Sequence, residues 1–60
     1  MIDETALREA SRAATLATVL VDRARLGSAN DPEQALARAE AYLERALDRI
    51  RSGRPAKAAA

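Results

Sequence analysis

The chain has 60 residues, a formal net charge of +1 and 48 % apolar residues. Alanine accounts for 16 of these residues, and only 13 side chains are large and apolar: seven Leu, two Val, two Ile, one Met and one Tyr. Because an alanine methyl group buries little area, the chain is too poor in large side chains for the core of an ordinary enzyme domain. We therefore expect no catalytic residues, and an isolated monomer of marginal stability.

The absence of Cys and His excludes disulfides, zinc fingers, thiol nucleophiles and imidazole bases. We accordingly expect no cofactor. No run approaches the roughly 20 apolar residues of a membrane span, and the sequence begins with acidic residues where a signal peptide is basic. Nine Arg against one Lys, with so much Ala, is typical of GC-rich bacteria and their phages. These features predict a cytoplasmic or virion-associated chain.

Residues 3–26 contain no Gly or Pro and few β-branched residues, which predicts a helix. Asp3 is suited to cap the free amides of the first turn, and Ile2 to contact Leu7 as a hydrophobic staple. Gly27 readily takes the left-handed conformation that ends helices, so this helix is predicted to stop near Leu26.

A second helix is predicted over residues 32–52. Asp31 is the predicted N-cap, with Asn30 as the alternative, and Pro32 occupies the first helical position, where its missing amide proton costs nothing. Gly53 is expected to end the helix.

Two helices of similar length with a short connector fold back on each other. The predicted fold is therefore all-α: an antiparallel two-helix hairpin, about 3–26 and 32–52, that completes its core by oligomerisation or on a larger partner. Residues 1–53 form the hairpin, and residues 54–60 are expected to be a flexible basic tail because they have nothing to bury.

Each predicted helix carries one apolar stripe at the 100° per residue of an α-helix. The stripe of the first helix consists mostly of small residues: Ile2, Ala6, Ala10, Ala13, Ala17, Leu20 and Ala24. That of the second is larger: Leu36, Ala39, Leu43, Ala46, Leu47 and Ile50. Because Leu36, Leu43 and Ile50 are spaced by seven residues, as in a coiled coil, we predict that the two stripes pack against each other.

Three large apolar residues of the first helix, Leu16, Val19 and Leu26, project away from its stripe. Arg12 and Arg23 lie beside them. Scattered exposed apolar residues are common, but three on one face of so small a protein favour a covered surface. These five residues are the predicted partner-binding or self-association site.

Positive charge gathers toward the C-terminus, where residues 45–60 carry four Arg and one Lys against one Asp. Arginine pairs bidentately with phosphate, so Arg45, Arg49, Arg51 and Arg54 are candidate anion-binding residues. The simpler interpretation is that cations at a helix C-terminus complement its dipole. No aromatic residue interleaves these arginines, so base stacking is not expected.

Three carboxylates, Glu40, Glu44 and Asp48, lie four residues apart on the second helix. Metal sites in helical bundles usually add His and point inward, so we interpret these carboxylates as a solvated acidic strip and predict no metal site.

Residues 39–47 resemble the second helix of a tetratricopeptide repeat, but that repeat would place its turn about seven residues later than the predicted connector from Gly27 to Asp31. The chain is assigned to no family.

These features predict a small non-enzymatic helical adaptor, assembly or inhibitor subunit that binds another protein or itself, as part of a bacterial or phage complex. The alternative hypothesis is a small nucleic-acid-associated regulator that uses its Arg-rich C-terminal end.

Overall fold

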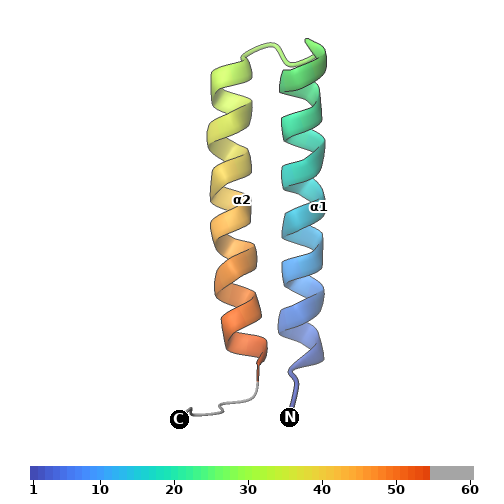
Figure 1. Ribbon diagram of the computed structural model, residues 1–60, viewed down its shortest axis with the longest axis vertical. Helices are drawn as coiled ribbons and strands as arrows, with labels where there is room; N and C mark the ends of the chain where they lie inside the picture. Colours follow the sequence, from blue (N-terminus) through green and yellow to red (C-terminus); the bar gives the residue numbers. More distant parts are fainter. Residues whose placement is uncertain (55–60) are drawn as a thin grey trace.

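The computed structural model describes residues 1–54, which form two α-helices. Helix α1 spans Glu4–Leu26 and helix α2 spans Pro32–Gly53. The helices run antiparallel and side by side along their whole length, joined by a short turn (Figure 1). The predicted all-α hairpin is thus confirmed, with helix boundaries within one residue of those expected. Of the predicted tail, only Arg54 belongs to the described residues.

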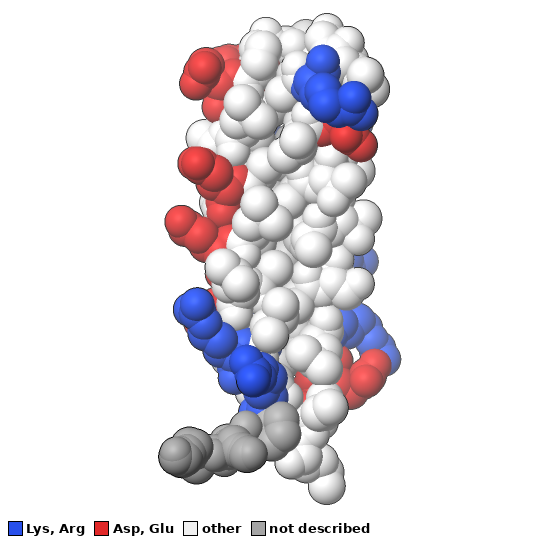
Figure 2. Space-filling view, in the orientation of Figure 1, with Lys and Arg blue, Asp and Glu red and all other residues white. Residues whose placement is uncertain are grey.

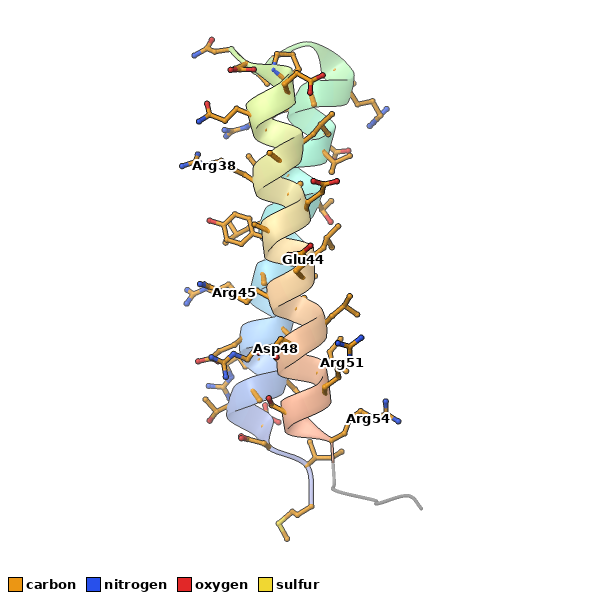
Figure 3. All side chains as sticks on the ribbon, turned by 90° about the vertical axis from the view of Figure 1, so that its left-hand side faces the viewer. Arg38, Glu44, Arg45, Asp48, Arg51 and Arg54 are labelled. Carbon is orange, nitrogen blue, oxygen red and sulfur yellow. The ribbon has the colours of Figure 1, made fainter. Side chains whose placement is uncertain are left out.

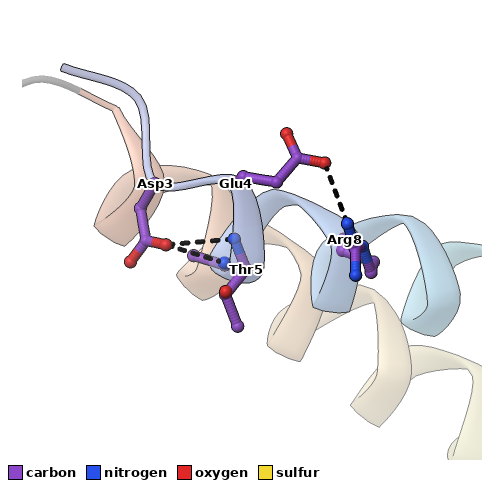
Figure 4. Close-up of polar contacts among 5 residues, drawn as sticks. Asp3, Glu4, Thr5 and Arg8 are labelled. Atoms are coloured by element: carbon purple, nitrogen blue, oxygen red, sulfur yellow. Dashed lines mark hydrogen bonds and ion pairs between the residues drawn. The ribbon is translucent and has the colours of Figure 1, made fainter.

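Both ends of α1 are set by local chemistry. The Asp3 carboxylate accepts hydrogen bonds from the backbone amides of Thr5 and Ala6, at 3.1 and 3.3 Å (Figure 4). These bonds satisfy amides that have no partner within the helix. At the other end Gly27 has φ of +79°, and its amide donates to the carbonyl of Arg23. A side chain at φ > 0 is strained, so glycine suits this position.

Helix α2 begins at the predicted Asp31 cap, whose carboxylate accepts from the backbone amide of Gln34 at 3.2 Å. Its last turn closes where the amide of Arg54 donates to the carbonyl of Ile50 at 3.1 Å. The open end of the hairpin is tied by one further backbone bond, from the Asp3 amide to the Gly53 carbonyl at 2.9 Å. The two helix ends away from the turn are therefore held in register.

The interface between the helices is built from small residues. Its buried members, which we call the alanine seam, are Ala6, Ala10, Ala13 and Ala17 of α1 and Ala35, Ala39, Ala46 and Gly53 of α2. No larger side chain within residues 1–54 is fully buried. At the open end, a Cβ atom on Gly53 would lie only 3.0 Å from the Leu7 Cδ2 atom. Small residues on both helices thus allow close backbone approach.

The prediction that the large apolar residues of α2 are buried against α1 is wrong. Ala39 and Ala46 are buried as expected, but the large members are 39–51 % exposed: Leu36, Leu43, Leu47 and Ile50. Ile2, expected in the stripe of α1, is 59 % exposed. Steric fit explains the difference, because leucines between the helices would hold the backbones apart and lose dispersion contacts. Instead, α2 turns its alanines toward α1 and leaves its leucines beside the seam.

Candidate interaction surfaces

One side of the hairpin is apolar along its length. Its two rows, together called the apolar face, are Leu7, Ala14 and Val21 of α1 and Leu36, Leu43, Leu47 and Ile50 of α2. At 100° per residue both rows lie about a quarter turn from the alanine seam, and Val21 and Leu43 line one shared hollow. Figure 2 shows this side as uncharged over its middle part, with acidic side chains along the α2 edge and basic side chains over its lower left and upper right parts. Apart from Leu7, the five Val, Leu and Ile side chains of the apolar face are 38–51 % exposed.

The opposite side of the hairpin carries a row of arginines. A hollow of about 340 Å³ between the helices is lined by Arg12, Arg45 and Arg49, with Leu16 and Tyr42. Arg38 and Arg45 line a second hollow beside Tyr42, and Arg23 and Arg38 line a third near the turn. Because neighbouring hollows share a residue, the five arginines form one continuous surface, which we call the arginine groove.

Two acidic residues also line these hollows. The Glu9 Oε1 atom lies 3.1 Å from the Arg49 Nε atom across the two helices. Asp31 lines the hollow near the turn and accepts the capping bond from Gln34. Five cations against two carboxylates leave the groove with a net positive charge.

The structure splits the four arginines predicted to bind anions. Figure 3 shows Arg38 and Arg45 projecting from one side of α2, and Arg51 and Arg54 from the other. Arg45 and Arg49 lie in the arginine groove. Their neighbours in the groove are Arg12, Arg23 and Arg38, with Tyr42 half-buried among them, and none of these four was predicted to bind anions.

The residues predicted to bind a partner are all exposed. Leu16 and Val19 are each 41 % exposed and Leu26 is 68 % exposed. Arg12 and Leu16 line one hollow of the arginine groove, and Arg23 lines another. Val19 and Leu26 point about 140–160° away from the alanine seam, toward the outer surface of α1.

The carboxylates Glu44 and Asp48 project from α2 away from α1 (Figure 3). Within residues 1–54, no group of acidic side chains is arranged to hold a metal ion. No helix in this part of the chain has the length and hydropathy needed to cross a membrane.

Comparison with known protein families, characterised proteins and solved structures finds no match to this chain.

Proposed function

We propose that the chain is a non-catalytic assembly subunit that completes its core by packing its apolar face against the same face of a second copy. The observation that carries this proposal is the combination of an alanine-only buried core with a row of half-exposed Leu and Ile side chains along most of α2. The product is a four-helix bundle made of two hairpins. Such a subunit serves as an adaptor or scaffold whose activity is association itself.

The free energy available on the apolar face is large for so small a protein. Each of its five 38–51 % exposed side chains gains about 1 kcal/mol when the remaining area leaves water. Two faces in contact therefore contribute on the order of 10 kcal/mol, the size of the net stability of a small domain. The seven buried alanine methyl groups of the seam, at about 0.8 kcal/mol each, contribute roughly half as much.

The direction of the apolar face suits a helical bundle. Leu7, Ala14 and Val21 follow one another at intervals of seven, as do Leu36, Leu43 and Ile50. A helix in a four-helix bundle contacts two neighbours at about a right angle to each other. The alanine seam supplies one contact of each helix here, and the apolar face, about a quarter turn away, supplies the other.

Charge along the edge of α2 favours a second copy in the opposite orientation. The spacing of 100° per residue places Glu33, Glu40 and Glu44 on this edge toward the turn and Arg51 on it toward the termini. Figure 3 shows Arg54 projecting on the same side as Arg51. If the turn of one hairpin lies beside the termini of the other, the acidic half of each edge faces the basic half of its partner. Exposed pairs of this kind add below about 1 kcal/mol each, but they select orientation.

Light scattering over a concentration range from about 5 to 500 µM tests the proposal, because dimerisation depends on concentration. We expect twice the chain mass at the upper end. Leu43→Asp should give a monomer, since it buries a charge in the apolar face. Val19→Asp, at a residue of similar exposure on the outer surface of α1, should stay dimeric.

Two outcomes would overturn the proposal. A wild-type chain that stays monomeric throughout this range does not use a second copy, and its partner is then a different protein. Dissociation by Val19→Asp with an intact Leu43→Asp dimer would assign association to Leu16, Val19 and Leu26.

A further inference from the structure

We propose that the arginine groove binds the phosphate backbone of a nucleic acid. This site is independent of the apolar face, because it lies on the opposite side of the hairpin. It shares Arg45 and Arg49 with the Arg-rich C-terminal end predicted from the sequence, but not Arg51 and Arg54, which project from the other side of α2 (Figure 3).

The distribution of charge favours a polyanionic ligand. Five of the nine arginines line the groove, contributed by both helices. Nine acidic residues are present in the chain, yet only Glu9 and Asp31 line these hollows. The folding of a nearly neutral chain has therefore separated its charges, with cations gathered on one side. A concentrated positive surface attracts a polyanion from solution.

Most guanidinium groups of the arginine groove have no carboxylate partner within residues 1–54. The ion pairs of residues 1–54 join Arg8 to Glu4, Arg25 to Asp22 and Arg49 to Glu9. Within that range Arg12, Arg23, Arg38 and Arg45 pair with no acid. Their planar donor groups stay available for phosphate oxygens, which they bind bidentately.

The arginine groove follows the long axis of the hairpin. Arg38 and Arg49 are eleven residues apart on α2, which corresponds to roughly 16 Å along the helix. Arg12 and Arg23 follow the same direction on α1. Successive phosphates of a nucleic acid strand rise about 3.4 Å in a duplex and are spaced more widely in an extended strand. The groove thus spans several phosphates, which matches a polymer better than a single phosphate group.

Tyr42 adds an aromatic surface to the groove. It is half-buried and lines the same hollows as Arg12, Arg38 and Arg45. No aromatic residue lies among the arginines of residues 45–54, but Tyr42, one turn earlier on α2, lines the same hollow as Arg45 and Arg49. An aromatic ring next to phosphate-binding cations is typical of surfaces that bind single strands. We accordingly commit to a single-stranded nucleic acid as the ligand.

The test uses fluorescence anisotropy with a labelled single strand of about 20 nucleotides of mixed sequence, a length that exceeds the groove. The key variant is Arg38→Gln/Arg45→Gln. Its matched control is Arg51→Gln/Arg54→Gln, which removes the same charge from the other side of α2. Circular dichroism and light scattering first verify that both variants keep the helicity and mass of the wild-type chain.

We expect the wild-type chain to bind at about 20 mM salt and to weaken steeply toward 150 mM, as counterions are released. The groove variant should lose at least about tenfold in affinity, and its salt slope should fall by roughly two, one for each lost phosphate contact. The control should lose less than about threefold. Tyr42 also packs against the alanine cluster, so Tyr42→Ala is first checked for wild-type helicity in the same way. It should then weaken binding at all salt concentrations, because stacking does not depend on counterions.

Three results would overturn the proposal. The first is no binding of the strand at low salt. The second is an equal loss in the groove variant and its control, which would assign binding to overall charge. The third is equally tight binding of poly-glutamate of matched length, which would assign the groove to acidic proteins.

Discussion

Replacing Ala13 tests how closely the two helices pack. Ala13 is 3 % exposed and forms a buried cluster with Ala10 and Ala46, against which Ala14 and Tyr42 pack. Leucine at this position adds three carbon atoms at the contact with Ala46, so the helices must separate or the side chain must turn from its preferred rotamer toward the hollow that Ala13 also lines. Glycine removes the methyl group instead. Both changes should destabilise the hairpin, for opposite reasons.

The magnitudes follow from the burial of Ala13. Overpacking by Ala13→Leu should cost about 1–3 kcal/mol. Ala13→Gly should cost about 1 kcal/mol through helix propensity and about 0.8 kcal/mol through the lost buried methyl group. Each kcal/mol lowers the melting temperature of a domain of this size by about 4–8 °C. Ala37, which is exposed on α2, provides the control. There, leucine should be nearly neutral and glycine should cost only the propensity.

Thermal unfolding followed by circular dichroism measures these differences. All variants are compared at one protein concentration, because association changes the apparent stability. A leucine at position 13 that is as harmless as the one at position 37 would show that the helices are not closely packed at the seam. The steric explanation for the exposed leucines of α2 would then fail.

Three further substitutions test the local contacts. Asp3→Ala should lower the stability by about 1 kcal/mol in thermal melts, because two amides lose their acceptor; an unchanged melting temperature would mean that water replaces the cap without loss. Gly27→Ala should destabilise by about 1 kcal/mol through its φ of +79° although the space around it is open, and a neutral result in the same melts would show that the turn relaxes. Arg49→Gln should cost below about 1 kcal/mol at low salt and nothing near 1 M salt, since its pair with Glu9 is about half exposed; a larger, salt-independent loss would indicate that the side chain acts by packing.

The elements of the fold were predictable because their signals are local. Asp3, Gly27 and Asp31 act on amides and carbonyls within a few residues, so the helix ends follow from the sequence alone. The rotation of α2 was not predictable from hydrophobicity. Its alanines and its leucines both recur at intervals of seven, and the larger residues carry the stronger apolar signal. Only the fit against the alanines of α1 selects the small residues for the interface.

The arginine groove could not be predicted from the sequence for a different reason. Arg12 and Arg45 are far apart in the chain and become neighbours only through the antiparallel pairing. One part of the signal is local, since Arg38, Arg45 and Arg49 recur at the spacing of one helical face. With α2 in its correct rotation, that spacing places them next to Arg12. Net charge along the chain instead groups Arg45 and Arg49 with Arg51 and Arg54, which lie on the other side of α2.

Disulfide formation by Leu43→Cys tests most directly whether the apolar face pairs with a second copy. The chain contains no cysteine, so one introduced thiol reports one contact. Leu43 is the central residue of the row Leu36, Leu43 and Ile50, and in an antiparallel pair it lies closest to its own counterpart. A disulfide requires the two Cα atoms to come within about 7 Å. Ala37→Cys, on the outer surface of α2, is the control.

The pairing predicts that Leu43→Cys converts to a covalent dimer under mild oxidation much faster than Ala37→Cys. The covalent dimer should also melt at a higher temperature than the reduced chain, because the bond removes the cost of association. Equal rates for the two cysteines, or a covalent dimer that melts below the reduced chain, would contradict the pairing of apolar faces.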